Sequence, residues 1–187
     1  ASVTEETLSE LAYKNNVSIN VEVQYSNKSQ LRQNDQVAEM IAKDYDVICV
    51  NPVDRTDAMQ IVDSAKEADI PVIFFNRELV NEDLNRWDKL YYVGADPEQS
   101  AIIQANIVVD AFSDETRIDE LDFNHDGVIQ YVMLEGEAGH QDAIVRTRVA
   151  VERIEAAGFE LEKLGDEIAN WNREQAASKM PSILNGH

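Results

Sequence analysis

The 187-residue sequence holds a single cysteine, and that cysteine lies within a short apolar run. One thiol cannot form an intrachain disulfide, so a small scaffold held together by disulfides is excluded. The position of Cys49 inside the run 46–50 predicts a buried thiol. A chain of this length buries enough surface to build its own hydrophobic core, and it needs no disulfide for stability.

Basic side chains are scarce. The sequence has 16 Lys and Arg against 36 Asp and Glu, which leaves a formal net charge of −20. A field of this sign repels phosphate backbones and anionic lipid, so it argues against nucleic-acid partners and membrane surfaces. The acids are spread along the chain, which indicates a solubilising role. No apolar run approaches the roughly 20 residues that a membrane-spanning helix requires.

Several motifs of catalytic and nucleotide-binding proteins are absent from the sequence. It has no glycine-rich dinucleotide or phosphate loop after a strand, no histidine spacing of a zinc site, and no nucleophile elbow. Enzymatic chemistry is therefore unsupported by these motifs rather than excluded, and our expectation is a protein that is not an enzyme. An α/β enzyme that acts through His140 and Asp142 is an alternative, and turnover of a substrate would identify it.

Short apolar runs alternate with amphipathic stretches of helical period along the chain. Predicted strands cover residues 17–25, 46–50, 71–75, 90–94, 128–134 and 159–164. Predicted helices cover residues 3–15, 29–43, 56–68, 141–157 and 173–180, and another begins after residue 96. This order is typical of an α/β fold in which helices flank parallel sheets. A boundary at residues 94–96 predicts an N-terminal lobe over 1–95 and a C-terminal lobe over 96–187.

Polar residues follow several predicted strands, where a parallel sheet places its ligand-binding crevice. Asn76 follows one of these strands, and His140 and Asp142 begin a helix after another. Asp142 and Arg146 stand four residues apart on one helix face. The pair could form an exposed ion pair, or it could present an acceptor and several donors to a neutral polyol. His140 is either a helix cap or a ligand-binding residue.

Trp171 lies in the polar segment 169–172, outside any evident apolar stripe. Two interpretations remain open from the sequence. The indole could belong to the core, or it could form an aromatic platform beneath a sugar ring.

A loop over residues 122–133 begins with the spacing of a calcium-binding loop. Oxygen donors occupy loop positions 1, 3, 5, 7 (a backbone carbonyl) and 9, and a glycine occupies position 6; these residues are Asp122, Asn124, Asp126, Val128, Gln130 and Gly127. Position 12 should be a bidentate glutamate, but it is Met133. Either the match is accidental, or the last ligand comes from another part of the protein.

Five segments, 46–54, 71–78, 91–94, 122–130 and 139–146, resemble in that order the galactose/glucose-binding branch of the bacterial periplasmic-binding-protein superfamily. Its members are substrate-binding components of sugar ABC transporters. The likeness runs over about residues 34–180. It implies two Rossmann-like lobes, of the type I arrangement, joined by a hinge and closing on one sugar. It also implies that both lobes are incomplete here, without the first strand of the N-terminal lobe and the later strands of the C-terminal lobe.

The resemblance assigns roles to individual residues. It implies that Asn76, His140, Asp142 and Arg146 hydrogen-bond sugar hydroxyls and that Trp171 stacks on the sugar ring. It further implies a structural calcium held by Asp122, Asn124, Asp126, the Val128 carbonyl and Gln130. In this family the final glutamate comes from a later strand, which would account for Met133.

The resemblance also implies partners and a location. The expected ligand is a monosaccharide, galactose or glucose, and the expected protein partners are an ABC transporter permease and a chemoreceptor. The expected location is the periplasm or the outer face of the cell membrane, with a lipid anchor as one arrangement. The alternative from another class is the effector-binding core of a sugar-responsive transcription regulator, which would need a helix-turn-helix ahead of this core; none is visible in the sequence.

Overall fold

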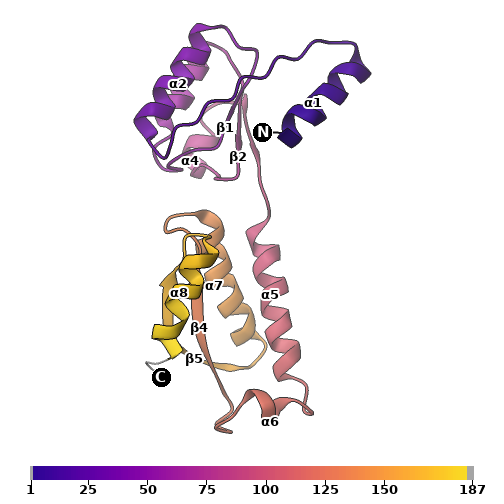
Figure 1. Ribbon diagram of the computed structural model, residues 1–187, viewed down its shortest axis with the longest axis vertical. Coiled ribbons are helices and arrows are strands. Elements are labelled where there is room, and N and C mark those ends of the chain that lie inside the picture. The colour runs from indigo at the N-terminus through magenta and orange to yellow at the C-terminus, as the bar shows by residue number, and fades with distance from the viewer. Residues whose placement is uncertain (1, 185–187) are drawn as a thin grey trace. The chain divides into compact units, whose positions relative to one another are not determined.

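A computed structural model describes residues 2–184 (Figure 1). The chain divides into two compact units. The first comprises the described residues of Ala1–Phe75 together with Leu79–Tyr92, and the second comprises Asn76–Glu78 and the described residues of Val93–His187. The boundary predicted at residues 94–96 would give each lobe one continuous range of residues. In the structure, however, Asn76–Glu78, which precede that boundary, belong to the second unit. No helix in the described part is long and apolar enough to cross a membrane.

The first unit is built on a three-stranded sheet in the order β1-β2-β3. Its strands are β1 (Ile48–Val50), β2 (Val72–Phe75) and β3 (Leu90–Val93), and its helices are α1 (Ser2–Asn15), α2 (Gln30–Ala42), α3 (Met59–Glu67) and the short α4 (Asn81–Leu84). β1 and β2 run parallel, with Ile48 opposite Val72. Parallel strands flanked by helices confirm the predicted α/β class.

The core of the first unit lies between this sheet and its helices. Val72 and Phe74 are fully buried, whereas Phe75 is 41% exposed, because successive side chains of a strand point to opposite faces. Ile61 and Val62 of α3 pack into the same cluster. Trp87, between α4 and β3, is partly buried against it.

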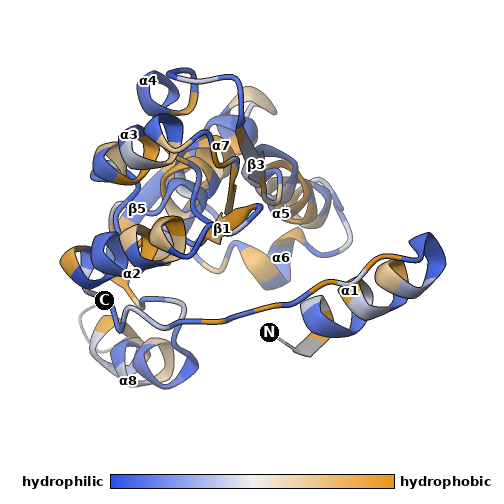
Figure 2. Cartoon of the chain, turned by 90° about the horizontal axis from the view of Figure 1, so that it is seen from above, coloured by the Kyte–Doolittle hydropathy of each residue, from blue (hydrophilic) through white to orange (hydrophobic). Residues whose placement is uncertain are grey.

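The strand predicted over residues 17–25 does not form. These residues are extended but belong to no sheet. Figure 2 shows that apolar and polar residues alternate along this segment, which joins α1 to α2. The alternation is typical of a strand, but a strand exists only where a neighbour completes its backbone hydrogen bonds. The segment is instead held by Glu22, which contacts Tyr45 and Lys43. Hydrogen bonds from Tyr45, Gln24 and Lys43 lower the pKa of Glu22 to about 2.

The prediction of a buried Cys49 is wrong, because the residue is exposed. β1 buries Ile48 and Val50 on one face, and Cys49 points to the other. The apolar run that predicted a buried thiol turns only one of its faces to the core.

The second unit contains the parallel pair β4 (Val128–Glu135) and β5 (Glu160–Ile168). Its helices are α5 (Pro97–Phe112), α6 (Ile118–Leu121), α7 (Gln141–Ala156) and α8 (Arg173–Leu184). Asp96 caps α5, since its carboxylate accepts from the Glu98 and Gln99 backbone N–H groups at 2.9 and 3.2 Å. β5 runs four residues past its predicted end at 164, because an irregularity in the pairing lets residues 165–168, among them the charged Asp166 and Glu167, continue the ladder with β4.

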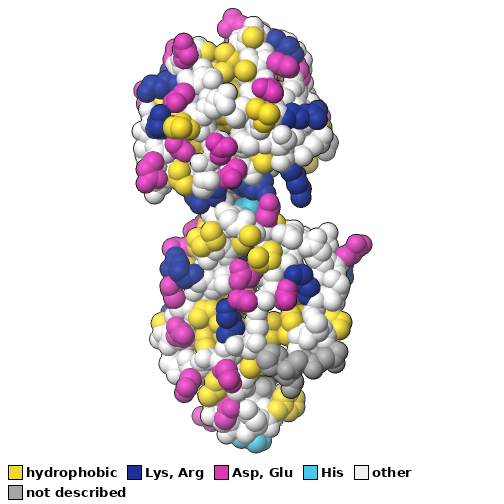
Figure 3. All heavy atoms as spheres, turned by 90° about the vertical axis from the view of Figure 1, so that its left-hand side faces the viewer, with side chains coloured by type: hydrophobic (Ala, Val, Ile, Leu, Met, Phe, Trp, Pro, Cys, Tyr) yellow, Lys and Arg dark blue, Asp and Glu magenta, His cyan; other side chains and the backbone are white. Residues whose placement is uncertain are grey.

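Two helices of the second unit pack closely against each other. Figure 1 shows α5 and α7 side by side, and buried alanines at 101, 105 and 150 allow their backbones to approach. This packing matters for the site, because residues of both α5 and α7 line it. Acidic side chains are scattered over the face in Figure 3 and form no single patch, which fits the expected solubilising role.

Candidate functional site

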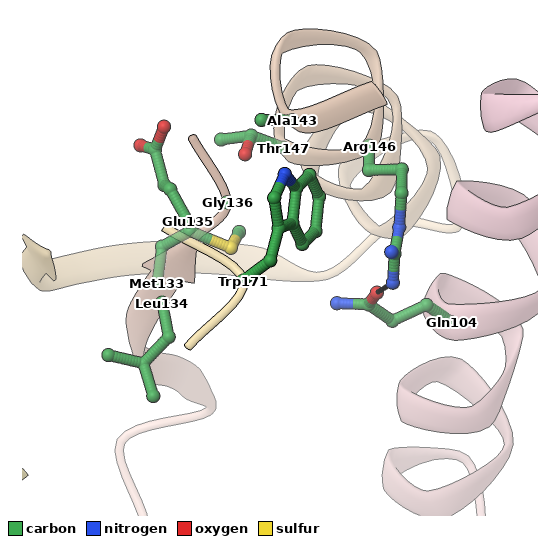
Figure 4. Close-up of a pocket in the computed structure, with 9 residues that line it drawn as sticks. All are labelled: Gln104, Met133, Leu134, Glu135, Gly136, Ala143, Arg146, Thr147 and Trp171. Atoms are coloured by element: carbon green, nitrogen blue, oxygen red, sulfur yellow. Dashed lines mark hydrogen bonds between the residues drawn. The ribbon is translucent and has the colours of Figure 1, made fainter. Parts of the chain in front are cut away.

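A small open pocket lies in the second unit where β4 ends. It is formed by residues of α5, the end of β4, the first turns of α7 and the loop after β5 (Figure 4). The lining residues are Gln104, Met133, Leu134, Glu135, Gly136, Ala143, Arg146, Thr147 and Trp171. The structure thus brings Arg146 and Trp171 together, two residues that are 25 positions apart in the sequence and were both predicted from it.

His140 is the N-cap of α7 and is only 5% exposed. Its Nδ1 accepts a hydrogen bond from the Asp142 backbone N–H at 3.2 Å. A backbone N–H only donates, so in the neutral ring the proton lies on Nε2, which is then the donor nitrogen. The His140 ring also meets Trp171 edge to face, with centroids 5.7 Å apart. The cap that the sequence suggested is therefore present, and the same ring packs on the aromatic residue of the pocket.

Arg146 lies on α7, one turn after Asp142. Its Nη2 donates to Oε1 of Gln104 at 3.3 Å, and its guanidinium carbon is 5.9 Å from the centre of the Trp171 ring. Its buried Nε has no hydrogen-bond partner within the described residues. A buried donor without an acceptor costs roughly 1–3 kcal/mol. A bound hydroxyl or carboxylate oxygen would remove that cost.

The ion pair considered between Asp142 and Arg146 is not among the ion pairs of the described residues. Arg146 instead contacts Gln104, 42 positions earlier on α5. Asp142 is partly buried at the start of α7, where its backbone joins the His140 cap. An aspartate in the first turn is favourable for the helix whether or not it binds a ligand.

Asn76 follows β2 and adopts a positive φ of 64°. Its N–H donates to the Val93 carbonyl at 3.2 Å, and its own carbonyl accepts from Nε2 of Gln141 at 2.8 Å. Both partners belong, with Asn76, to the second unit. The backbone of Asn76 is therefore tied to the first residue of α7, the helix that carries the other predicted polar residues.

Trp171 is half exposed and lines the pocket, so it is not a core tryptophan. It has a positive φ of 57° in the turn after β5. Two backbone hydrogen bonds hold this turn against the end of β4, from Ala169 N–H to Glu135 O at 2.8 Å and from Asn170 N–H to Gly136 O at 3.3 Å. The ring is presented by a fixed turn, as an aromatic platform requires.

Of the residues that line the pocket, sequence reasoning predicted Arg146 and Trp171, and the others that it missed include Gln104 and Gly136. Gln104 lies inside a helix, and no local pattern marks a helical glutamine as a partner of a residue on another helix. The position of Gly136 directly after a strand was the one available signal, because ligand crevices form there. Figure 4 shows the oxygen of Gln104 turned toward Arg146 and the indole of Trp171 beside Gly136.

In the candidate calcium loop, the carboxylates of Asp122 and Asp126 accept hydrogen bonds from backbone N–H groups of the loop itself. Oδ2 of Asp122 accepts from the Gly127 N–H at 2.9 Å, and Gly127 has a positive φ of 76°, which favours glycine. Asp126 accepts from the Val128 N–H and from the amides of Gln130 and Asn124. These hydrogen bonds, led by that of Val128, hold the pKa of Asp126 below its usual range.

The donor set of this loop fits a hard cation. Oδ1 of Asp122 is buried and has no hydrogen-bond partner within the described residues. Amide N–H groups of Asn124 and Gln130 gather on the Asp126 carboxylate, and rotation of these amides would present oxygen instead. The described residues hold no group of three or more His, Cys, Asp or Glu suited to a metal, so two carboxylates with amide and carbonyl oxygens would have to suffice.

Comparison with known proteins places these observations in a family. A family model described as a periplasmic binding protein domain matches residues 2–187. The chain is 36% identical over 159 residues to the D-galactose/methyl-galactoside binding periplasmic protein of Haemophilus influenzae, an alignment that covers 85% of this chain and 47% of that protein. The chain thus spans about half the length of the curated relatives it matches.

Solved structures agree with this family in fold. An ABC transporter solute binding protein from Bacillus halodurans with bound myo-inositol is 29% identical, with a TM-score of 0.66, and the match covers 86% of this chain and 50% of that one. A periplasmic solute binding protein from Actinobacillus succinogenes with bound D-allose has a TM-score of 0.74 at 23% identity, covering 98% and 59%. The likeness expected from the sequence is confirmed, and the chain belongs to the periplasmic binding protein domain family.

Proposed function

We propose that this chain is the part of a sugar-binding protein that supplies one wall of the sugar site, and that the protein binds a hexose, galactose or glucose, without altering it. The bound sugar would be delivered to the permease of an ABC transporter. Such delivery takes place outside the cytoplasmic membrane, in the periplasm or from a lipid-anchored protein at the cell surface. A chemoreceptor is a further proposed partner.

The observation that carries this proposal is the buried Nε of Arg146 beside the half-exposed ring of Trp171. A sugar offers what both groups lack, namely hydroxyl oxygens for a fixed donor and a C–H face for an indole. The proton on Nε2 of His140 and the carboxylate of Asp142 add a donor and an acceptor at the start of the same helix. The half-site therefore combines one platform with several polar groups, as a polyol requires.

Galactose and glucose are proposed over other sugars because the chain is 36% identical to the galactoside-binding relative. A second candidate is myo-inositol, since the 29% identical neighbour was solved with it. Both ligand types are six-membered rings rich in hydroxyls. They differ in the ring oxygen, which is an acceptor only in the sugar, so a direct comparison of affinities separates them.

Isothermal titration calorimetry of the chain, and of the complete natural polypeptide that carries it, is expected to detect galactose or glucose binding and weaker binding of ribose. Selectivity arises because the wrong ligand leaves a buried polar group unpaired, at roughly 1–3 kcal/mol for each group. If myo-inositol binds most tightly, it becomes the proposed ligand in place of the hexose. An absence of heat with all four ligands in the complete polypeptide would contradict the proposal.

We further propose that the loop at residues 122–130 holds a structural calcium, bound by Asp122, Asn124, Asp126, the Val128 carbonyl and Gln130. Bound calcium would supply positive charge that joins the loop to the start of β4. Its support is the buried Oδ1 of Asp122 together with the order of oxygen donors along the loop.

Calcium is expected to raise the melting temperature of the chain relative to a chelator. A ligand that binds only the native state at 100 times its Kd stabilises it by about 2.7 kcal/mol. The Asp122→Asn variant should lose most of this shift, because it removes one of two loop carboxylates. Thermal melts followed by circular dichroism measure the effect.

Asp119→Asn is the matched control, since Asp119 lies just before the loop and its side chain is 87% exposed. It should keep the full calcium shift. Equal melting temperatures in calcium and chelator for the unmodified chain would mean that the loop is only a turn.

A further inference from the structure

The indole of Trp171 lies directly on a residue that has no side chain. A Cβ built on Gly136 would fall 2.1 Å from Cζ2 of Trp171 and 2.4 Å from both Cε2 and Cη2. Real Cβ atoms essentially never approach another heavy atom so closely. The φ of Gly136 lies outside the left-handed region, so the reason for a glycine here is space for the ring and not backbone freedom.

The backbone cannot separate to make room for a side chain at this position. The turn that carries Trp171 is bonded to the end of β4 on both sides of the contact, by Ala169 N–H to Glu135 O and by Asn170 N–H to Gly136 O. Moving the turn away would break these hydrogen bonds. The indole itself would have to retreat by about 1.3 Å, from 2.1 Å to the 3.4 Å of an ordinary van der Waals contact.

The other neighbours of the ring depend on its present position. His140 meets the ring edge to face at 5.7 Å, and the guanidinium of Arg146 lies 5.9 Å from its centre. In Figure 4 the indole lies between Gly136 and Arg146. A ring displaced from Gly136 would lose one of these contacts or press on the other.

We propose that Gly136 is a positioning residue of the binding site, because its lack of a side chain sets where the Trp171 indole lies relative to His140 and Arg146. The proposal rests on the proposed sugar site for its effect on binding. Binding sites hold their contact groups to within roughly 0.5 Å, so a displacement of more than 1 Å is large enough to impair a stacking platform.

The test is Gly136→Ala with Gly165→Ala as the matched control. Gly165 lies on the neighbouring strand β5, and a Cβ there meets nothing within 4 Å. Both variants are made with Trp87→Phe, so that Trp171 is the only tryptophan and its emission reports on one ring. We expect Gly136→Ala to shift this emission to longer wavelength, to increase its quenching by acrylamide, and to weaken hexose binding by at least about tenfold, which corresponds to about 1.4 kcal/mol.

A double-variant cycle with Trp171→Phe separates positioning from a general loss of folding. Two of the three clashing atoms, Cζ2 and Cη2, lie farther from the backbone than a phenylalanine ring reaches. Gly136→Ala should therefore cost little affinity and little stability when Trp171 is already phenylalanine, a coupling that independent residues would not show. If Gly136→Ala fails to fold alone, the double variant should fold.

The outcomes distinguish this proposal from the proposed function. The emission of Trp171 is measured without sugar, so it decides the role of Gly136 even if no sugar binds. If Gly136→Ala shifts the emission but the unmodified protein binds no sugar, the positioning role of Gly136 is supported and the proposed sugar-binding function is rejected. Emission, affinity and stability like those of Gly165→Ala, or an additive cycle, would overturn the positioning role.

Discussion

Arg146→Ala is expected to lower hexose affinity by roughly 10- to 150-fold, because a hydrogen bond to a charged group contributes about 1.5–3 kcal/mol. The buried Nε has no hydrogen-bond partner within the described residues, and in the proposed function a sugar hydroxyl supplies the acceptor. Loss of the guanidinium also removes the neighbour of the Trp171 ring and leaves Oε1 of Gln104 without its donor. Calorimetric titration with galactose and glucose measures the change in Kd.

Arg148→Ala is the control for this variant. Arg148 is on the same helix but is exposed, and it pairs with Glu152 at 2.8 Å. An exposed pair of this kind contributes at most about 1 kcal/mol to stability. We expect an unchanged Kd for Arg148→Ala, and equal losses in the two variants would mean that Arg146 acts through the charge of the helix and not through contact with the sugar.

Phe74→Ala is expected to destabilise the first unit by about 3–5 kcal/mol. The side chain is fully buried at the centre of the β2 strand, so its removal loses apolar burial and leaves a cavity. Urea denaturation followed by Trp87 fluorescence, in a Trp171→Phe background, reports on the first unit, because Trp87 packs against the same core.

Phe75→Ala provides the comparison, since it removes the same atoms one residue along. Phe75 is 41% exposed on the other face of β2. It should cost about 1 kcal/mol or less, because less of its surface leaves water on folding. A larger cost for Phe75→Ala than for Phe74→Ala would mean that β2 presents its other face to the core.

Much of the fold could be predicted from short-range pattern. The cap at Asp96 and the proline after it marked the start of α5, and the amphipathic period of residues 141–156 marked α7. These signals act between residues that are a few positions apart. Backbone bonding within a helix is equally local, so the pattern and the structure agree.

Strand 17–25, Cys49 and the end of β5 show where such pattern reasoning fails. Alternating apolar residues predict a strand, but the ladder needs a partner that the local sequence does not name. Cys49 lies in an apolar run whose second face stays exposed in the part of the chain that the structure describes. β5 continues through Asp166 and Glu167 because β4 extends beside it, and no local pattern in residues 165–168 predicts that pairing.

The candidate site was also only partly predictable from the sequence. Its residue types were evident from the sequence, since a capping histidine, an aspartate, an arginine and a tryptophan follow predicted strands. Their partners were not evident. Arg146 was expected to meet Asp142 four residues away, and in the structure it donates to Gln104 on another helix.

By itself the sequence determined the α/β class, most helices and strands, and the family resemblance, and it supplied the candidate residues for the proposed sugar and calcium sites. Only the tertiary structure decided which of those side chains meet, that Cys49 is exposed, that residues 17–25 form no strand, and that Trp171 lies on Gly136. The physical reason is the sequence separation of the residues that interact. Helix formation, capping and side-chain chemistry depend on neighbours in the chain, whereas strand pairing, burial and the close approach of a ring to a bare Cα depend on residues brought together only by folding.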